Sequence, residues 1–326
     1  MVRLFLLLLT TLSLHAAKTL DIYFVDVEGG QATLMVTPSG ESMLVDTGWP
    51  GFDGRDAKRI AAAAEKAGVK KIDWLVITHF HTDHVGGIRQ LADRLPIVNI
   101  IDHGQTVESS KNAQDLTAMF TEVASKARRR TVKPGDTIAV KGLKVEVLAA
   151  HGEAATRKGQ PNPLCGAAQR KADDPSDNAR SVGTLITFGR FRFLDLGDLT
   201  WNKELELVCP ENRIGKVDLY LTTHHGMDAS GPKELVHAIA PRVAIMNNGE
   251  KKGGAPPAWQ VIKSSPGLQD LWQVHFSAAG GAANNVDEKM IANPAGQDPG
   301  HYLMVQAQSN GKFSVTNSRN GFTKSY

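Results

Sequence analysis

Cysteine is scarce in this sequence. Among 326 residues only Cys165 and Cys209 occur, and neither stands in a Cys-x-x-Cys pair or at a zinc-ligand spacing from histidine. This argues against a thiolate zinc site. In an oxidising compartment two thiols can pair where the fold brings their Cα atoms close together. The sequence leaves both a pair and two separate thiols open, and we predict the Cys165–Cys209 disulfide.

A surplus of one charge sign and long hydrophobic runs are also absent. The 37 Lys and Arg residues nearly balance the 34 Asp and Glu residues, so bulk charge gives no reason to expect stable nucleic-acid binding. Beyond the N-terminus no apolar run approaches the roughly 18 residues of a membrane-spanning helix, and no repeat of about 20–50 residues indicates a solenoid. The hydrophobic share of 41% is typical of a globular chain with a sizeable core.

The N-terminus has the pattern of a secretory signal. Arg3 precedes an apolar run over 4–14, and small alanines follow. The run is shorter than the about 20 residues that a transmembrane helix needs. We therefore expect residues 1–17 to be a cleaved signal peptide, and residues 18–326 to be a single periplasmic or secreted domain without a membrane anchor.

Short apolar runs closed by turn residues alternate with helical patterns along the chain. Strands are predicted over 20–27, 32–37, 42–48, 72–78, 97–102, 137–140, 143–148, 181–189, 191–198, 217–225 and 242–249, and helices over 55–67, from about 86, over 113–130 and near 233–240. This alternation predicts an α/β fold in which helices cover sheets.

Two segments break the alternation. Residues 152–180 lack periodicity and are rich in Gly, Pro, Asp and Lys, which predicts a long loop insertion that is either a lid or the rim of the substrate site. The tail from about residue 251 is expected to be an irregular C-terminal extension that ends in two strand-like runs.

The run Thr78–His84 (THFHTDH), directly after a predicted strand, is the most informative feature of the sequence. Its three imidazoles and one carboxylate are ligands suited to zinc or iron. A spacing of two lets His79 and His81 point the same way from an extended strand end, while Asp83 and His84 turn toward a second position. Such a run would pack poorly, because buried imidazoles need several hydrogen-bond partners and repel one another when protonated. The run therefore predicts a metal site.

Most histidines also lie at the C-terminal ends of predicted strands. Of the ten beyond residue 17, seven lie at or just after the C-terminal end of a predicted strand, the sheet edge at which α/β proteins build sites. These are His79, His81, His84, His103, His151, His224 and His225. For the other three, His237, His275 and His301, we expect ordinary surface or core roles.

Five short motifs resemble the metallo-β-lactamase fold or one of its branches. Residues 79–84 match its HxHxDH signature, 44–48 (LVDTG) look like its early strand ending in Asp, and 193–198 (FLDLGD) look like its later strand ending in Gly-Asp. The sequence LTTHHG at 221–226 and the Asn-x-x-Ser at 178–181 resemble the branch that contains the competence proteins ComEC and Rec2. The resemblance leaves the C-terminal tail without a counterpart.

The resemblance implies a four-layer αβ/βα sandwich with two divalent metal ions at one edge of its two sheets. The implied ligands are His79 and His81 for the first metal, Asp83 and His84 for the second, Asp198 as the bridge between them, and His225 to complete the second site. Zinc is the favoured metal.

Other residues take roles around this site. The resemblance places Asp46 behind the ligands, where it would accept a hydrogen bond from a ligand imidazole and fix its tautomer. Asp83 would also orient the attacking hydroxide, and His224 would protonate the leaving oxygen. The sequence leaves open which of His224 and His225 is the ligand.

One expected ligand is missing. Most enzymes of this fold give the first metal a third histidine just before the strand that ends in Asp198, and here Asn178 occupies that region. Either His151 completes the first site, or the metal has two imidazoles, Asp198 and water, a weaker site that would suit manganese or iron. Further candidates for a ligand or substrate contact are Asn178 itself, Ser181, His103 and Asn247.

These features predict an exported metal-dependent hydrolase. Water on such metals ionises with a pKa of about 7 and gives the attacking hydroxide. A phosphodiester or related ester, in a small molecule or a polymer, is the expected substrate, ahead of lactams and thioesters, because the HHG branch includes phosphodiester-cleaving members. The alternatives are a metal-binding protein without hydrolytic turnover and a DNA-processing component like the soluble domain of ComEC. The sequence does not indicate the oligomeric state.

Overall fold

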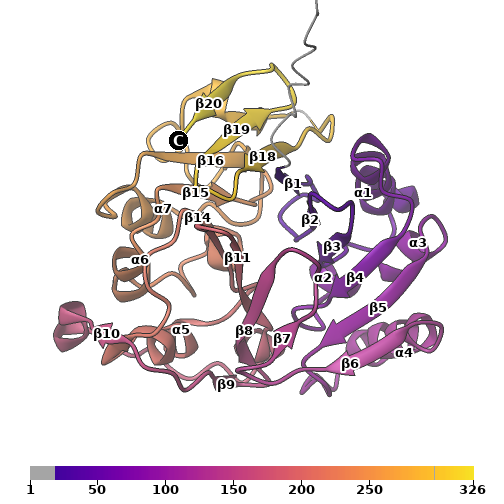
Figure 1. The fold of residues 1–326 in the computed structure, drawn as a ribbon, viewed down its shortest axis with the longest axis horizontal. Coiled ribbons are helices and arrows are strands. Elements are labelled where there is room, and N and C mark those ends of the chain that lie inside the picture. The colour runs from indigo at the N-terminus through magenta and orange to yellow at the C-terminus, as the bar shows by residue number, and fades with distance from the viewer. Residues whose placement is uncertain (1–18, 297) are drawn as a thin grey trace, which may run out of the picture.

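The computed structural model describes residues 19–296 and 298–326, so the predicted signal peptide lies outside the described residues. Within these ranges two nine-stranded sheets pack face to face, and helices lie on both outer sides (Figure 1). The fold is the predicted four-layer αβ/βα sandwich.

The first sheet has the strand order β20-β19-β18-β1-β2-β3-β4-β5-β6. Its strands are β1 (Leu20–Phe24), β2 (Thr33–Val36), β3 (Ser42–Val45), β4 (Ile72–Val76), β5 (Ile97–Asp102), β6 (Arg128–Thr131), β18 (Leu303–Ala307), β19 (Phe313–Asn317) and β20 (Thr323–Ser325). Its outer face is covered by α1 (Arg55–Lys66), α3 (Ile88–Ala92) and α4 (Lys111–Ala124). In α1 the buried Ala57, Ile60 and Ala64 share one face, which explains why this alanine-rich segment docks as a helix.

The second sheet has the order β17-β16-β15-β14-β12-β11-β8-β7, with β9 paired to β8. Its strands are β7 (Thr137–Ile138), β8 (Lys144–Ala150), β9 (Glu153–Ala154), β11 (Gly183–Phe188), β12 (Phe191–Asp195), β14 (Leu219–Leu221), β15 (Val243–Met246), β16 (Asp270–His275) and β17 (Ile291–Asn293). Its outer face is covered by α5 (Trp201–Val208), α6 (Lys233–Ile239) and α7 (Pro256–Lys263). Because β12, β14 and β15 run parallel, their carboxyl ends meet at one edge, where ligands bind in such sheets.

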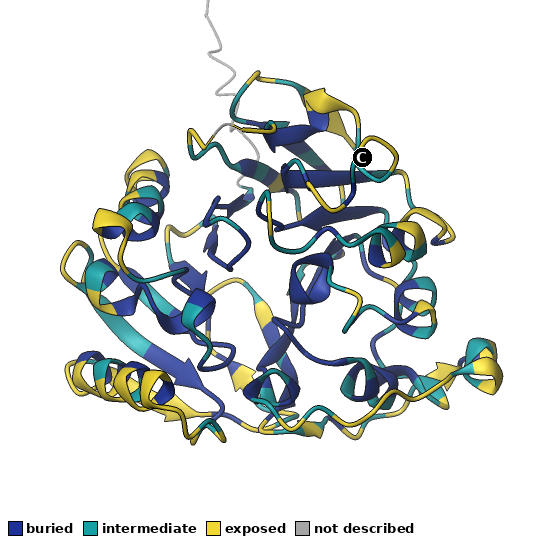
Figure 2. Ribbon diagram, turned by 180° about the vertical axis from the view of Figure 1, so that it is seen from behind, coloured by how far each residue is buried: buried dark blue, intermediate teal, exposed yellow. Residues whose placement is uncertain are grey.

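The main core lies between the two sheets. Phe24 of β1 and Phe193 of β12 meet there edge to face, with ring centroids 5.8 Å apart. Figure 2 shows most of the central strands buried and the outer sides of the helices exposed, while the edge strands β6 and β20 are exposed. The central part of each sheet therefore buries both faces, which fits strands that are almost continuously apolar.

Segment 152–180 contains no long helix or strand, yet it is fastened to the second half of the chain. A disulfide joins Cys165 to Cys209, which confirms the predicted pair. Next to it, β10 (Gln160–Pro161) pairs with β13 (Glu211–Asn212). The segment thus lies against the region around the end of α5.

The predicted helix over 113–130 was wrong at its end. Helix α4 stops at Ala124, and Arg128–Thr131 form β6 at the edge of the first sheet. Arg129 pairs with the buried Asp102 of β5, with Nε 2.7 Å from Oδ2. Exposed arginines on an edge strand also discourage pairing with another chain.

The expectation of an irregular tail from residue 251 was also wrong. Helix α7 and strands β16 and β17 extend the second sheet, while β18 to β20 extend the first. Strand β18 pairs antiparallel with β1, with Leu20 opposite Ala307. Because the partners lie almost 300 residues apart in the chain, no local pattern could have revealed the pairing.

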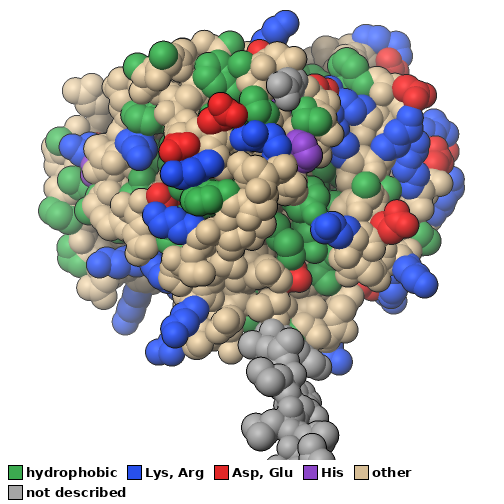
Figure 3. Space-filling model, turned by 90° about the horizontal axis from the view of Figure 1, so that it is seen from above, with side chains coloured by type: hydrophobic (Ala, Val, Ile, Leu, Met, Phe, Trp, Pro, Cys, Tyr) green, Lys and Arg blue, Asp and Glu red, His purple; other side chains and the backbone are tan. Residues whose placement is uncertain are grey.

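Two surface properties can be stated for the described residues. None of their helices combines the length and apolar character needed to cross a bilayer. On the face seen in Figure 3, Lys and Arg side chains are interspersed with Asp and Glu, in line with the small net charge of +3.

Candidate metal centre

The run Thr78–His84 lies where the two sheets approach each other at one edge. It follows β4, and the carbonyl of Thr78 accepts a hydrogen bond of 2.8 Å from Val182 N at the start of β11. Helix α2 (Thr82–Val85) then begins directly after His81. The second sheet contributes Asp198, after β12, and the turn 223–226, after β14.

Four buried side chains form the tightest group at this edge. Asp83, His84, Asp198 and His225 each offer one ligand atom, and these four atoms lie within 4.8 Å of one another. The Nε2 atom of His84 lies 3.2 Å from Asp83 Oδ2 and 3.2 Å from Asp198 Oδ2. For His225 Nε2 the distances to Asp83 Oδ2 and Asp198 Oδ1 are 3.3 and 3.2 Å. The sequence predicted all four as ligands.

Opposite charges compensate within this group. Burial alone would raise the pKa of Asp83 and Asp198, but the neighbouring imidazoles hold the pKa of both carboxyls well below the usual range. Burial would lower the pKa of His84, but Asp198, Asp83 and Asp46 raise it well above 6.5. The group therefore requires positive charge, which a divalent cation supplies in place of a proton.

Two ligand imidazoles are oriented by partners behind them. Asp46 Oδ2 lies 2.7 Å from His84 Nδ1, and Asp46 also accepts from the backbone and hydroxyl of Thr78. The hydroxyl of Thr78 lies 3.0 Å from His79 Nδ1. Each contact leaves Nε2 free on the side of the site. The buried Nε2 of His79 has no hydrogen-bond partner among the described residues.

The first position is looser than the second. His79 Nε2 lies 4.0 Å from Asp198 Oδ2, and the rings of His79 and His81 are 4.6 Å apart. His81 is partly exposed, and its Nε2 lies 3.1 Å from Glu108 Oε1. A carboxylate on Nε2 leaves Nδ1 as the nitrogen available to a metal.

The two histidines after β14 sit in a left-handed turn. His224 and His225 both have φ of 56° and Gly226 has φ of 74°, a conformation that costs about 1–3 kcal/mol for each non-glycine residue. Hydrogen bonds hold the turn: Tyr220 Oη accepts from Thr223 N, and His225 O accepts from Gly254 N. Such strain is typical of functional sites.

His224 faces the carboxylate of Asp198 from outside the group of four. Its Nε2 lies 3.4 Å from Asp198 Oδ2, and its Nδ1 lies 3.2 Å from Ser230 Oγ. The Ser230 hydroxyl donates to the carbonyl of Leu199, so its oxygen accepts from His224 Nδ1–H. His225, not His224, thus belongs to the compact group, as the sequence analysis favoured.

The donor set of the group of four fits a divalent cation. Buried imidazole nitrogens and carboxylate oxygens converge, and the Nε2 of His79 has no other partner among the described residues. Imidazole and carboxylate are suited to zinc, iron and manganese.

Comparison with known proteins agrees with this geometry. Residues 25–157 match the Metallo-beta-lactamase superfamily. The chain carries a metallo-beta-lactamase superfamily domain. This domain contains the whole run from Asp46 to His84, while Asp198 and the His-His-Gly turn lie beyond the matched residues.

Three relatives are similar to this chain in sequence, at low identity. ComE operon protein 3 of Bacillus subtilis (strain 168) is 23% identical over 257 residues, which cover 74% of this chain and 30% of that protein. Recombination protein 2 of Haemophilus influenzae is 25% identical over 247 residues, covering 75% and 26%. The UPF0173 metal-dependent hydrolase H16_A2129 of Cupriavidus necator is 27% identical over 249 residues, covering 72% and 76%.

The first two relatives confirm the predicted resemblance of this metallo-beta-lactamase domain to the ComEC/Rec2-like branch. The chain spans less than a third of the length of either.

The structure does not bring His151 or His103 into the metal centre. His151 is exposed, and its Nδ1 lies 3.4 Å from the guanidinium of Arg180. His103 is buried, but its Nε2 lies 3.0 Å from Asp177 Oδ2 and its ring packs against Phe80. Neither therefore replaces the third histidine usual in metallo-beta-lactamase domains.

Three other candidates stay open. Asn178 Oδ1, Ser181 Oγ and Asn247 Oδ1 are buried and have no hydrogen-bond partner among the described residues. Such atoms are uncommon in native proteins and usually have a water, ion or ligand as partner. The structure gives them no contact with the group of four.

Sequence reasoning missed three residues at the candidate metal centre. Glu108 contacts His81, and the buried Asp177 accepts from Phe80 N and Val107 N, which ties two loops of the site together. Lys252, after β15, forms an ion pair with Asp83 Oδ2. Only the Lys-Gly-Gly that follows a predicted strand was a signal for Lys252.

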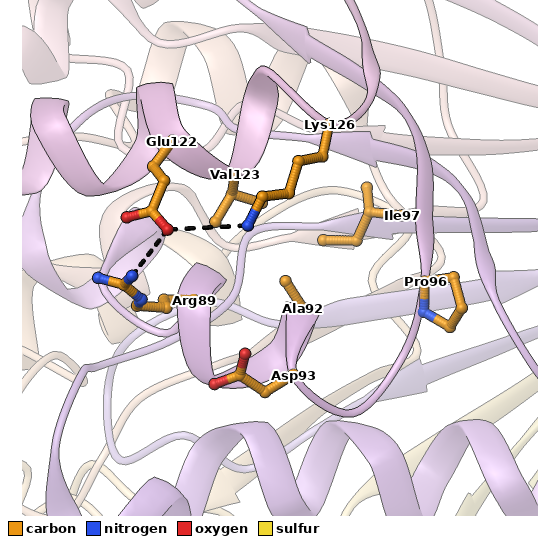
Figure 4. A pocket seen from close by; sticks show the side chains of 8 residues that line it. All are labelled: Arg89, Ala92, Asp93, Pro96, Ile97, Glu122, Val123 and Lys126. Carbon is orange, nitrogen blue, oxygen red and sulfur yellow. Dashed lines mark hydrogen bonds and ion pairs between the residues drawn. The ribbon is translucent and has the colours of Figure 1, made fainter.

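A hollow on the helical surface is a separate feature. It lies between α3 and α4, has a volume of about 370 Å³, and contains ion pairs of Glu122 with Arg89 and Lys126 (Figure 4). None of its lining residues is a predicted metal ligand.

A second cluster of ligand-type residues is already neutralised. Asp26, Glu28, His275 and Asp298 lie close together, but Arg59 Nη1 lies 2.8 Å from Asp26 Oδ2. Burial alone would lower the pKa of His275, but the nearby Asp26 and Glu28 raise it to about 9. Its role is a core ion pair, as expected for this histidine.

Proposed function

We propose that the protein is a metal-dependent hydrolase that holds two divalent ions and acts on a phosphodiester or related ester. The observation that carries this proposal is the buried group of four ligand atoms within 4.8 Å of one another. The metallo-beta-lactamase superfamily domain and a relative named as a metal-dependent hydrolase support the same reaction class.

The proposed ligands are His79 and His81 for the first ion, Asp83, His84 and His225 for the second, and Asp198 for both. Zinc is the proposed metal, with manganese and iron as alternatives because the first position has fewer donors. When bound, the ions would supply Lewis acidity, which lowers the pKa of the attacking water to about 7 and polarises the bond that breaks.

The chain's own residues would handle orientation and proton transfer. Ser230 fixes the Nδ1 proton of His224, so the proton that His224 exchanges is on Nε2, which faces Asp198. Burial lowers the pKa of His224, which makes its protonated ring a good donor to a leaving oxygen. Asp83 would accept a hydrogen bond from the attacking water and orient it.

A phosphodiester is the proposed substrate, ahead of lactams and thioesters. Two cations stabilise both the attacking and the leaving oxygen of an in-line displacement, and this arrangement recurs in phosphoryl-transfer enzymes. A superfamily domain alone does not select the substrate.

Export belongs to the same proposal. The signal pattern of residues 1–17 and the Cys165–Cys209 disulfide support a periplasmic or secreted protein. Mass spectrometry of protein from its native envelope should find Lys18 at or near the N-terminus. An intact Met1 on a membrane-bound form would contradict export.

A metal-binding protein without turnover is the second candidate. It is favoured by the first position, where His81 Nε2 faces Glu108 and His151 is exposed. A DNA-processing component is the third, suggested by the two longer relatives.

One experiment separates these candidates. The purified protein is analysed for bound metal and assayed with a phosphodiester, a lactam, a thioester and single-stranded DNA. We expect two ions per chain and turnover of the phosphodiester. One ion and no turnover would favour the second candidate, and turnover of DNA alone would favour the third.

A further inference from the structure

Lys252 is held against the metal centre by the backbone around it. The loop that follows β15 packs onto the left-handed turn, since Gly254 N donates to His225 O and Ala255 N donates to Gly226 O, both at 2.9 Å. Gly249 N also donates to Lys252 O at 2.8 Å. Lys252 is therefore fixed relative to the ligand His225.

A second loop closes on the other side of Lys252. Gly29 has φ of 77°, and a Cβ at Gly29 would lie 2.9 Å from the Cβ of Lys252. Only glycine therefore allows the loop after β1 to pack this closely. The backbone of Lys252 is enclosed by parts of both sheets.

The side chain of Lys252 reaches the ligand group. Its Nζ pairs with Asp83 Oδ2, the oxygen that also lies 3.2 Å from His84 Nε2 and 3.3 Å from His225 Nε2. Nζ lies 5.2 Å from the ring centroid of Trp49, and 29% of the side chain is exposed. The ammonium thus lies between the ligand group and solvent.

The ammonium of Lys252 affects the binding of both a metal ion and a substrate at this site. A divalent cation on Asp83 and the Nζ of Lys252 compete for one carboxylate oxygen and repel each other. Two divalent ions and a lysine exceed the negative charge of Asp83 and Asp198. An anionic substrate would reduce this excess of positive charge, whereas a neutral carbonyl compound would not.

We propose that Lys252 is the substrate-binding group that recognises the anionic oxygen of a phosphoryl ester. This inference rests on the proposed function and names a determinant of its substrate class. A lysine ammonium binds phosphate oxygens as a point charge with three donors.

The test uses three variants of the full chain. Lys252→Met removes the charge but keeps an apolar side chain over Trp49, Lys252→Arg keeps the charge, and Lys251→Met is the control at an exposed neighbouring position. Zinc affinity is measured by competition with a chromophoric chelator. Binding of inorganic phosphate to the zinc-loaded proteins is measured by calorimetry.

We expect Lys252→Met to bind zinc more tightly, by about tenfold, and phosphate more weakly, by about tenfold, as for one lost charge-assisted contact. Lys252→Arg should bind phosphate within about threefold of the wild type, and Lys251→Met should match the wild type in both measurements. Unchanged phosphate affinity in Lys252→Met would overturn the inference, and so would an equal loss in Lys251→Met.

Failure of the proposed role of Lys252 can be distinguished from failure of the proposed hydrolase function. If the wild type hydrolyses a phosphodiester but Lys252→Met keeps its KM and its phosphate affinity, the function stands and the role of Lys252 is refuted. If phosphate binding depends on Lys252 but no phosphodiester is hydrolysed, the anion site stands and the hydrolase proposal fails.

Discussion

Asp46 Oδ2 lies 2.7 Å from Nδ1 of His84, and both side chains are fully buried. The contact fixes the tautomer of His84 so that Nε2 points to Asp83 and Asp198. Asp46 follows β3 of the first sheet with φ of 62°, a conformation that favours Asn and Asp among non-glycine residues. The carboxylate behind the ligand is thus built into the end of a strand.

Replacing this carboxylate tests its role. In Asp46→Asn the side chain keeps its shape but one oxygen becomes an NH₂ donor, so it no longer matches both Thr78 and His84. We expect metal affinity to fall about 10–100-fold, as for other groups behind metal ligands. Chelator competition measures the loss, and Asp93→Asn, at an exposed position, should bind metal as the wild type does.

Replacing His224 and replacing His225 should affect metal binding and kcat differently. We expect His224→Ala to retain most of the bound metal and to lose about 10²–10⁴-fold in kcat, because the ring is the proposed proton donor and is outside the group of four. His225→Ala should lose metal as well. Metal analysis with kinetics on both variants decides the assignment, and metal loss only in His224→Ala would reverse it.

Glu204 gives the protein a predictable pH dependence. It is a fully buried residue of α5 that accepts a hydrogen bond from Gly231 N, and burial raises its pKa to about 8. The folded state keeps a proton that the unfolded chain releases above about pH 4.5, so the free energy of unfolding falls as pH rises from about 4.5 to 8.

Glu204→Gln should therefore be more stable than the wild type at pH 8, by on the order of 3 kcal/mol, and about equal to it at pH 5. Urea denaturation at the two pH values measures the difference. Glu206→Gln, on the same helix but partly exposed, is the control. A constant difference between wild type and Glu204→Gln at both pH values would refute this account of Glu204.

The disulfide should contribute to stability through the unfolded chain. Cys165 and Cys209 close a loop with a sequence separation of 44 residues, which corresponds to about 4 kcal/mol in the chain-entropy treatment. The double variant Cys165→Ala/Cys209→Ala should lose a similar free energy of unfolding. Finding two titratable thiols in the unreduced, unfolded protein would show that the bond does not form.

The sequence predicted what is encoded locally. The run from His79 to His84, Asp46 and Asp198 all follow buried strands in short motifs, so their chemistry and spacing could be seen without the fold. The apolar periodicity also identified most strands and the helix that ends before Gly68.

The parts of the fold and of the site that were not predicted depend on contacts between segments far apart in the chain. Lys252 lies 169 residues from Asp83 in the chain, and a lysine before two glycines looks like an ordinary turn. Glu108 was hidden for the same reason, since its contact with His81 depends on the buried Asp177. Strands β18 and β19 alternate buried residues with more exposed ones, but only the fold pairs β18 with β1.

The most direct test of the dinuclear centre is the metal content of Asp198→Ala. Asp198 faces His84, His225 and His79, so its loss removes the one carboxylate proposed to contact both ions. We predict that Asp198→Ala binds no more than a trace of metal and has no phosphodiesterase activity, while His237→Ala on α6 matches the wild type in both. Full metal occupancy together with full phosphodiesterase activity in Asp198→Ala would contradict the dinuclear hydrolase account.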